Sequence, residues 1–433
     1  MNSRREVDLV IIGAGIGGVI CLYYARKAGL NAVVLEQQPV IGGLWAQLPA
    51  WQDIQIKPVD WTLGDLPIDG AHQPDILKNI RAWVDQFGLA SWIELDTPVM
   101  RAERKADRWE VTTPGQTWIA RHLVSATGAH NRPMVPPVVR EARAGATLRE
   151  LHSSALRDPT ELTGRDVVIV GAGASGFDLL DLCFEYKARK VAWVYRSVHW
   201  MVPTRKPKSV AGDIRGLARQ QMQGATVDQN NRALNADLRG RYEKFGLMDI
   251  LPDYPFDLGL HQLIPGRFRM LDQFGEIERH QAEVVRIAGN QVHLSSGAKL
   301  SADTLLWGTG YEADLSYFAS PALAGIKHMQ QVARRCACVF QYLDQPNLYF
   351  LATILEGTGS GPFAYSIGCR SIVAHMRGKA RFDTVPTGTK IAHFDFLPYF
   401  AARDPDSFPP GQWRAHYEKL ALSWPDDVPL PIP

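Results

Sequence analysis

The sequence lacks a marked excess of charge of either sign. Lysine and arginine together number 47, and aspartate and glutamate number 45, so the formal net charge is +2. Proteins that bind nucleic acid through its phosphates carry a concentrated basic surface, and this balance excludes a broad electrostatic field of that kind. We therefore expect no nucleic-acid partner.

Cysteine is scarce as well. The chain has five cysteines, an odd number, and none of them forms a CxxC pair. Cys336 and Cys338 form a CxC pair, but no second pair is present to complete a metal site. The pattern argues against a disulfide scaffold and against a bound metal, and it favours a protein of the reducing cytoplasm.

Long apolar runs are confined to the N-terminal region. Residues 9–25 contain no charged side chain, and Arg4 and Arg5 precede them, as in a signal peptide or a short membrane anchor. The run is interrupted by GAGIGG at residues 13–18, which is typical of a tight turn and not of a membrane helix. No other apolar stretch approaches the roughly 20 residues that a bilayer requires. We expect no membrane association.

What the sequence does contain is enough material for several folded domains. Its 433 residues are 46% hydrophobic and 21% charged, which excludes wholesale disorder. Since domains usually have roughly 100 to 200 residues, the length predicts about two or three of them.

The first informative motif is a strand, glycine turn, helix and second strand near the N-terminus. Gly13 permits the turn, Gly15 lets the backbone approach a pyrophosphate, and Gly18 lets helix and strand pack closely. The N-terminus of the helix offers free N–H donors to phosphates. The second strand ends at Glu36, which is placed to accept hydrogen bonds from ribose hydroxyls. This unit predicts a site for FAD or NAD.

The same unit occurs again in the middle of the chain. A strand over residues 167–170 leads into Gly171, Gly173 and Gly176, and a helix and another strand follow. The residue after that strand is Arg196, where the first unit has an acid. A guanidinium can bind a ribose 2′-phosphate that a carboxylate would repel, so this site suits NADPH. The alternative is that Arg196 is a solvated charge at a strand end.

Two nucleotide sites of opposite preference in one chain indicate hydride transfer between them. Nicotinamide donates a hydride, and flavin accepts it and passes the electrons on singly or in pairs. We therefore expect FAD in the first site and NADPH in the second.

Further motifs follow in a specific order. They are GGLW (residues 42–45), ATG (126–128), LHSSAL (151–156), RSVHWMVP (196–203), DTLLWGTGY (303–311) and PNLYFLATILEGTGSG (346–361). With the two glycine turns, these segments resemble the flavin-containing monooxygenases and Baeyer–Villiger monooxygenases, the class B flavoprotein monooxygenases. The resemblance extends over nearly the whole chain.

The resemblance implies an α/β fold of two Rossmann-like dinucleotide-binding domains, in which an NADPH domain interrupts the FAD domain. The expected FAD domain comprises residues 1–160 and 301–433, the latter with a C-terminal tail. The expected NADPH domain comprises residues 161–300, with an insertion at about 205–265 that covers the substrate side.

The resemblance also implies a set of cofactor-binding positions, most of them glycines and small residues in the turns. The candidates are Gly13, Gly15, Gly17, Gly18, Glu36, Gln37, Gly43, Leu44, Trp45, Val99, Ala126, Thr127, Gly128, Gly171, Gly173, Ala174, Ser175, Gly176, Arg196, Ser197, Gly308, Thr309, Gly310 and Gly361. The turns 126–128 and 308–310 would let the backbone pass near a cofactor and would mark chain crossings between domains. The alternative is that they are ordinary strand-ending turns.

The catalytic candidates are fewer. Family members carry a polar residue near the reactive flavin edge after GGLW, and Asp53, Gln55 and Lys57 are the nearest choices here. His152 matches the histidine of the family fingerprint, but the Phe, Gly and aromatic positions of that fingerprint are replaced by Ala146, Leu148 and Leu156. His152 is either a link between domain position and cofactor state or a structural histidine. No clear match to the active-site arginine of the Baeyer–Villiger subgroup is present.

The predicted function is that of an FAD- and NADPH-dependent monooxygenase. The resemblance implies that a flavin C4a-(hydro)peroxide inserts one oxygen atom of O2 into a small organic substrate, by N- or S-oxygenation, with Baeyer–Villiger oxidation of a ketone as the alternative. Alternatives of another class are an FAD/NADPH reductase or oxidase and a non-catalytic flavin-binding protein. A disulfide reductase, one such reductase, would need a redox cysteine pair. The oligomeric state stays open, with a homodimer as one option.

Overall fold

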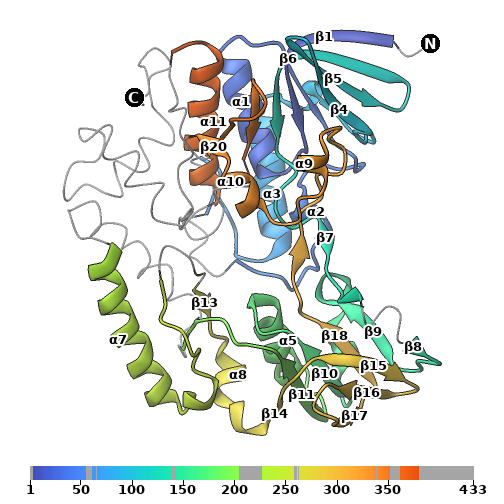
Figure 1. The fold of residues 1–433 in the computed structure, drawn as a ribbon, viewed down its shortest axis with the longest axis vertical. Coiled ribbons are helices and arrows are strands. Elements are labelled where there is room, and N and C mark those ends of the chain that lie inside the picture. The colour runs from blue at the N-terminus through green and yellow to red at the C-terminus, as the bar shows by residue number, and fades with distance from the viewer. Residues whose placement is uncertain are drawn as a thin grey trace.

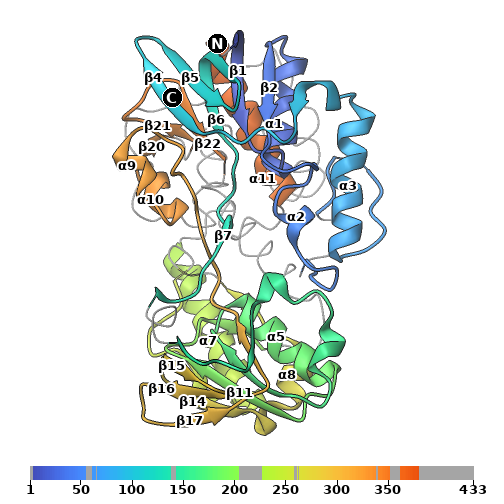
Figure 2. The same cartoon turned by 90° about the vertical axis from the view of Figure 1, so that its right-hand side faces the viewer.

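The computed structural model describes residues 3–54, 61–64, 66–137, 143–203, 227–257, 261, 263–337, 340–351 and 361–379. These residues form two lobes, each built on a mainly parallel sheet with helices beside it (Figures 1 and 2). The predicted α/β fold with two dinucleotide-binding-type sheets is thereby confirmed.

The first lobe is built on a nine-stranded sheet. Its main path has the order β20-β21-β22-β6-β1-β2-β3, and β4 and β5 extend it from β6. Strands β22, β6, β1, β2 and β3 run parallel. The last four residues of β1 and all of β2 are apolar and buried, the pattern of parallel strands covered on both faces. Helices α1 and α11 lie side by side against this sheet (Figure 1). The elements of this lobe are β1 (Ser3–Ile12), α1 (Ile16–Lys27), β2 (Ala32–Leu35), α2 (Leu44–Gln47), α3 (Gln73–Gln86), η2 (Ala90–Trp92), β3 (Ile93–Glu94), β4 (Arg101–Lys105), β5 (Arg108–Thr113), β6 (Gln116–Ser125), α9 (Pro321–Ala324), α10 (Met329–Ala333), β20 (Cys336–Ala337), β21 (Gln341–Tyr342), β22 (Leu348–Phe350) and α11 (Gly361–Met376).

The second lobe is built on a five-stranded parallel sheet of order β14-β11-β10-β18-β9. A smaller sheet of order β17-β16-β15-β8 packs beside it around Ile287 and Val292. The elements are β8 (Arg143–Ala144), β9 (Arg149–His152), η3 (Ser153–Ala155), η4 (Pro159–Leu162), β10 (Asp166–Val170), α5 (Ala174–Glu185), β11 (Lys190–Tyr195), β12 (Met201–Val202), α7 (Val227–Phe245), η5 (Met248–Ile250), β13 (Ile264–Pro265), α8 (Phe268–Asp272), η6 (Phe274–Glu276), β14 (Glu278–Gln281), β15 (Val284–Ala288), β16 (Gln291–Leu294), β17 (Lys299–Ser301) and β18 (Thr304–Trp307).

The second lobe takes more of the chain than the sequence indicated. The expected boundaries at residues 160 and 300 leave β9 and β18 in the first lobe, whereas both strands pair in the second sheet, β9 with β18 and β18 with β10. The chain crosses between the lobes near β7 (Arg132–Pro133) and β19 (Tyr311–Glu312), which pair antiparallel (Figure 2). Parallel pairing joins strands far apart in sequence, so local patterns give no sign of which sheet they enter.

The apolar N-terminal run consists of the end of β1, a glycine turn and α1. Among the described residues, no helix combines the length and the hydropathy needed to cross a bilayer.

The described part of the expected insertion contains α7 and a packed aromatic group. Trp200 contacts Tyr242, Tyr254 and Phe256 at ring-centroid distances of 5.8, 6.5 and 6.2 Å. The Trp200 indole N–H donates to the carbonyl of Tyr254 at 3.0 Å. These contacts hold the insertion against β12 in the second lobe.

A buried histidine in the first lobe makes stability depend on pH. Burial, aided by the nearby charges of Arg121 and His375, lowers the pKa of His122 in β6 to about 4. Its folded pKa is below the ordinary unfolded value, so the unfolded chain binds more protons between these values. The contribution of neutral His122 to stability is therefore fully present above the unfolded pKa and is lost as the pH drops toward 4.

Replacing His122 by glutamine should flatten this dependence. Between pH 7 and pH 5, we expect the free energy of unfolding to fall by about 2 kcal/mol more in the wild-type chain than in His122→Gln. Urea unfolding of both chains at the two pH values measures the difference. Equal losses would show that His122 does not titrate in this way.

Candidate functional site

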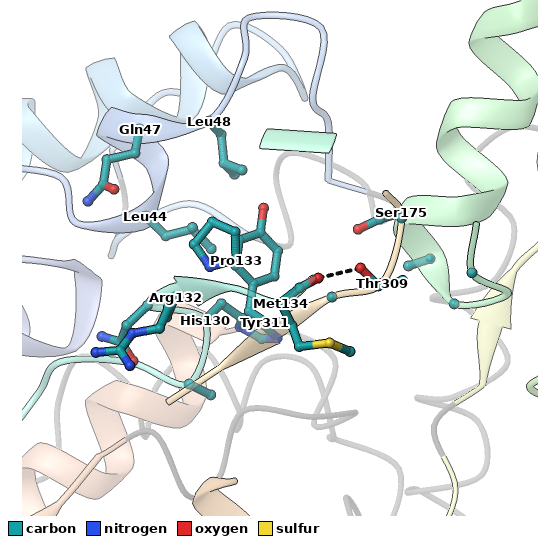
Figure 3. A pocket seen from close by; sticks show the side chains of 18 of the residues that line it. Leu44, Gln47, Leu48, His130, Arg132, Pro133, Met134, Ser175, Thr309 and Tyr311 are labelled. Atoms are coloured by element: carbon teal, nitrogen blue, oxygen red, sulfur yellow. Dashed lines mark hydrogen bonds between the residues drawn. The ribbon is translucent and has the colours of Figure 1, made fainter. Parts of the chain in front are cut away.

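The two lobes enclose a cavity of about 1580 Å³ that is lined from both sides. Leu44 of α2 and Leu48, which follows that helix, face it from the first lobe, and Ser175 at the start of α5 faces it from the second (Figure 3). Pro133 and Tyr311 of the crossing segments lie between them, and the Thr309 hydroxyl donates to the Met134 carbonyl there. The cavity therefore joins the two glycine turns.

The first glycine turn is held by close backbone contacts. A Cβ atom on Gly13, whose φ is +104°, would lie 2.8 Å from the Ala126 carbonyl oxygen. A Cβ on Gly18 would lie only 1.9 Å from the Gly13 carbonyl oxygen, so any larger residue would force the turn to move. A Cβ on Gly15 would meet nothing closer than the Gly43 Cα atom at 3.6 Å. Gly13 and Gly18 thus shape the turn, and Gly15 leaves the space beside it open.

The start of α1 presents backbone donors to this open space. No side chain caps the helix, and its first turn has no acidic residue. Gly15, Ile16 and Gly17 line the cavity. Uncapped N–H groups at a helix N-terminus bind phosphate groups, so this end of α1 fits a pyrophosphate.

Glu36 lies directly after β2 at the edge of the cavity and is 5% exposed. Its carboxylate accepts hydrogen bonds from the N–H of Ala14 at 2.6 Å and from the N–H of Gln38 at 2.8 Å. Burial raises the pKa of Glu36, and these backbone donors act against the shift. The backbone donors therefore fix Glu36 in the position expected of a ribose acceptor.

The GGLW segment packs directly on this turn. Gly43 has a φ of +56°, and a Cβ there would lie 2.7 Å from the Gly15 Cα atom. Leu44 and Trp45 follow on α2 and line the cavity, where the Trp45 ring meets Trp61 edge to face at 5.5 Å. The two glycine segments and the tryptophan pair form one wall of the cavity.

The second glycine turn repeats the first in its packing. A Cβ on Gly171 would lie 2.3 Å from the Gly308 carbonyl oxygen, and one on Gly176 would lie 2.2 Å from the Gly171 carbonyl oxygen. A Cβ on Gly173 would meet nothing within 4 Å, and no side chain caps α5, which begins after it. The turns at 126–128 and 308–310 thus each pack on one of the two glycine turns.

Arg196 follows β11 at the cavity and is largely exposed. Its guanidinium lies 3.6 Å from the Glu283 carboxylate, and the two side chains are 75% and 59% exposed. An exposed pair at this distance contributes little to stability, so the guanidinium can turn to a phosphate at low cost. Arg196 also lines the cavity.

Asp53 also faces the cavity, but its carboxylate is already paired. Arg267 donates to it from both terminal nitrogens, at 2.6 and 3.2 Å. Arg267 comes from the second lobe, 214 residues further along the chain, and no sequence pattern pointed to it. The other two candidates in this segment, Gln55 and Lys57, lie outside the described residues.

His152 ends β9 and is 9% exposed, but it does not line the cavity. Its Nε2 atom donates to the Gly310 carbonyl at 3.0 Å, and its Nδ1 atom accepts from the Ser154 N–H at 3.2 Å. Burial lowers the pKa of His152, and the Gly310 carbonyl acts against the shift. A neutral ring whose two nitrogens are both hydrogen-bonded favours the interpretation of His152 as a structural histidine that holds the crossing segment. The neighbouring Tyr311 ring, which contacts His152, lines the cavity.

Most of the remaining cofactor candidates also line the cavity. They are Gln37, Val99, Ala126, Thr127, Gly128, Ala174, Ser197, Gly308, Thr309 and Gly310. Gly361 begins α11. Tyr365 of the same helix lines the cavity, a residue that the sequence analysis missed. The ring of Tyr365 lies 3.0 Å from where a Cβ atom on Gly17 would be. Because this contact joins segments that are far apart in sequence, no local pattern could have pointed to Tyr365.

In the described part of the chain, Cys21, Cys183, Cys336 and Cys369 are buried, and none of them lines the cavity. No group of three or more metal-binding side chains occurs among these residues either. Cys338 lies outside them.

Comparisons with known proteins agree with this geometry. A family model described as pyridine nucleotide-disulphide oxidoreductase matches residues 10–236. Flavin-containing monooxygenase 5 of Rattus norvegicus is 25% identical over 224 residues, which are 44% of this chain and 41% of the relative. Phenazine N-monooxygenase PhzNO1 of Lysobacter antibioticus is 26% identical over 217 residues, 47% of this chain and 39% of the relative. The chain thus matches less than half the length of these curated relatives.

Solved structures match over more of the chain. A crystal structure of OTEMO in complex with FAD and NADP has a TM-score of 0.66 at 15% identity, over 86% of this chain and 85% of that one. An open structure of cyclohexanone monooxygenase has a TM-score of 0.64 at 18% identity, over 86% and 87% of the two chains. These structures share the fold. The resemblance predicted from the motifs is confirmed.

Proposed function

Because the chain belongs to the pyridine nucleotide-disulphide oxidoreductase family, we propose that it is an FAD- and NADPH-dependent monooxygenase that inserts one oxygen atom of O2 into a small organic substrate. The observation that carries the proposal is a cavity shared by two similar glycine turns with opposite charges at their strand ends, Glu36 and Arg196. Opposite charges select different nucleotides, and a shared cavity lets the two meet.

The residues of each turn fit the group proposed for it. At the first turn, the N-terminus of α1 would hold the FAD pyrophosphate beside Gly15, and Glu36 would accept from the ribose hydroxyls. At the second, the N-terminus of α5 beside Gly173 would hold the NADPH pyrophosphate, and Arg196 would bind the 2′-phosphate. The first lobe is accordingly the FAD domain and the second the NADPH domain.

When bound, FAD would take a hydride from NADPH and supply the means to activate O2. The chain's own contribution is to orient the two nucleotides and to keep water away. Trp45 and Trp61 form an apolar wall beside the first turn, and Tyr311 and Pro133 lie between the two turns. Excluding water favours transfer of oxygen to the substrate over release of hydrogen peroxide.

For the substrate, we favour oxygenation of nitrogen or sulfur. The matched relatives include a flavin-containing monooxygenase and a phenazine N-monooxygenase, and the tryptophan pair suits a neutral, apolar substrate. Baeyer–Villiger oxidation of a ketone is the alternative, since cyclohexanone monooxygenase shares the fold. Disulfide reduction is disfavoured, because each described cysteine is buried away from the cavity.

The test has two stages. Protein reconstituted with FAD is first mixed with NADPH without oxygen, and we expect the yellow colour to fade. Oxygen is then admitted with a tertiary amine, a thioether or a ketone, and the product is analysed for an atom of labelled oxygen. Colour that persists with NADPH contradicts any FAD/NADPH enzyme. Fading followed by hydrogen peroxide alone, with every substrate tried, indicates an oxidase.

A further inference from the structure

The two glycine turns belong to different lobes, so hydride transfer requires the lobes to keep one orientation. On one side the β7–β19 ribbon joins them. Elsewhere, residues 51–53 of the first lobe contact the second. The Trp51 indole N–H donates to the Leu156 carbonyl at 2.6 Å, and the Gln52 amide donates to the Asp178 carboxylate at 3.0 Å. This second contact surface contains an ion cluster.

Arg267 is the centre of that cluster. Its two terminal nitrogens bind Asp53 of the first lobe at 2.6 and 3.2 Å, and its Nε atom binds Asp178 of α5 at 2.6 Å. A guanidinium presents its donors in a fixed plane, and this arrangement uses them on two carboxylates from different lobes. The Asp53 contact has the bidentate geometry that fixes direction as well as distance.

Arg267 itself is anchored in the second lobe. It precedes α8, and the Asp181 carboxylate of α5 accepts from the backbone N–H groups of Arg269 and Met270 at 2.6 and 2.9 Å. These bonds satisfy donors at the start of α8 and fix it on α5. The Arg267 guanidinium therefore moves with the second lobe and reaches across to the first.

The environment makes the cluster sensitive to the loss of a partner. The side chains of Arg267, Asp53 and Asp178 are 20%, 21% and 5% exposed. Burial alone would lower the pKa of Arg267, but the two carboxylates outweigh it and raise that pKa. A guanidinium that is mostly buried needs a counter-ion at all times. Asp178 supplies one whenever Asp53 is released.

We propose that Arg267 is a positioning residue that sets the orientation of the two lobes by binding Asp53, while Asp178 keeps it paired when the lobes separate. The inference rests on the proposed function, because that orientation brings the nicotinamide site to the flavin site. Asp53, a catalytic candidate by sequence, then acts through Arg267.

The test measures lobe separation directly. Cysteines introduced for spin labels at Arg81 of α3 and Ala236 of α7, both exposed, report the distance between lobes. The chain without these cysteines sets the background. In Asp53→Asn and in Arg267→Lys, we expect the ratio of separated to closed chains to rise about tenfold, the effect of one lost charge-assisted contact. The double variant should separate no more than the more affected single variant, because both substitutions remove the same contact between Arg267 and Asp53.

A kinetic readout accompanies the distances. At saturating NADPH, flavin reduction should slow about fivefold to tenfold in both variants, with the Kd for NADPH changed less than about twofold. The matched control is Asp249→Asn, which removes a carboxylate from Arg279 within one lobe and should change neither quantity.

Three results would overturn the proposal: a distance distribution in Asp53→Asn as narrow as in the wild type, additive effects in the double variant, or equal broadening in Asp249→Asn. If NADPH fails to reduce the wild-type flavin, the proposed function is wrong, and the distance measurements still decide the role of Arg267.

Discussion

Gly15→Val is expected to give folded protein without flavin. Gly15 adopts an extended backbone conformation, with φ of −76° and ψ of −174°, which β-branched residues accept. Its added Cβ would meet the Gly43 Cα atom at 3.6 Å, an ordinary contact, so the chain has room for it. The valine methyl groups would extend into the cavity beside the N-terminus of α1, where the pyrophosphate is proposed to bind. We expect flavin content to fall more than about tenfold.

The matched variant is Gly18→Ala. Its single added carbon would lie 1.9 Å from the Gly13 carbonyl oxygen, so the turn between β1 and α1 would have to move. We expect Gly18→Ala to lose both flavin and about 1–3 kcal/mol of stability, whereas Gly15→Val loses only the flavin. Absorbance of the purified proteins gives the flavin content. Thermal unfolding of the apoproteins gives the stability, because bound flavin would itself raise the Tm. A yellow Gly15→Val protein would show that the pyrophosphate lies elsewhere.

The difference between these two glycines shows what the sequence can predict. The turn motifs are local, since Gly13, Gly15 and Gly18 lie within one short segment, and their spacing with the flanking strands predicted β1, α1, β2 and the equivalent second unit. Their roles also follow from local geometry, because the close Gly18 contact is made within the turn itself.

The contacts that set the relation between the lobes could not be predicted in this way. Arg267 and Asp53 are 214 residues apart, and neither residue has a neighbour pattern that marks an ion pair. Strands β9 and β18 were placed on the wrong side of the domain boundaries for the same reason, since neither the RELH sequence of β9 nor the TLLW sequence of β18 indicates which sheet the strand enters. Sequence patterns report periodicity along the chain, and these features depend on which distant segment lies alongside.

Arg196→Ala is expected to weaken NADPH binding and to leave NADH binding nearly unchanged. Arg196 follows β11 at the cavity and is opposite in charge to Glu36 in the equivalent position. Its acidic partner is the exposed Glu283 at 3.6 Å. Losing a charged hydrogen bond to the 2′-phosphate would cost about 1.5–3 kcal/mol, or a roughly 10- to 150-fold rise in the Kd for NADPH. NADH has no 2′-phosphate, so its affinity provides the internal reference.

Two further variants separate this role from a general loss of positive charge. Arg189→Ala removes the same charge just before the opposite end of β11, where Arg189 binds Asp166 at 2.8 Å, and should leave the ratio of NADPH to NADH affinity unchanged. Glu283→Gln removes the carboxylate that competes for Arg196 and should tighten NADPH by no more than about 1 kcal/mol. Titration of each protein with both nucleotides gives the affinities. If Arg196→Ala keeps the wild-type ratio, the guanidinium is a solvated strand-end charge, and nucleotide selection must come from another residue of the cavity.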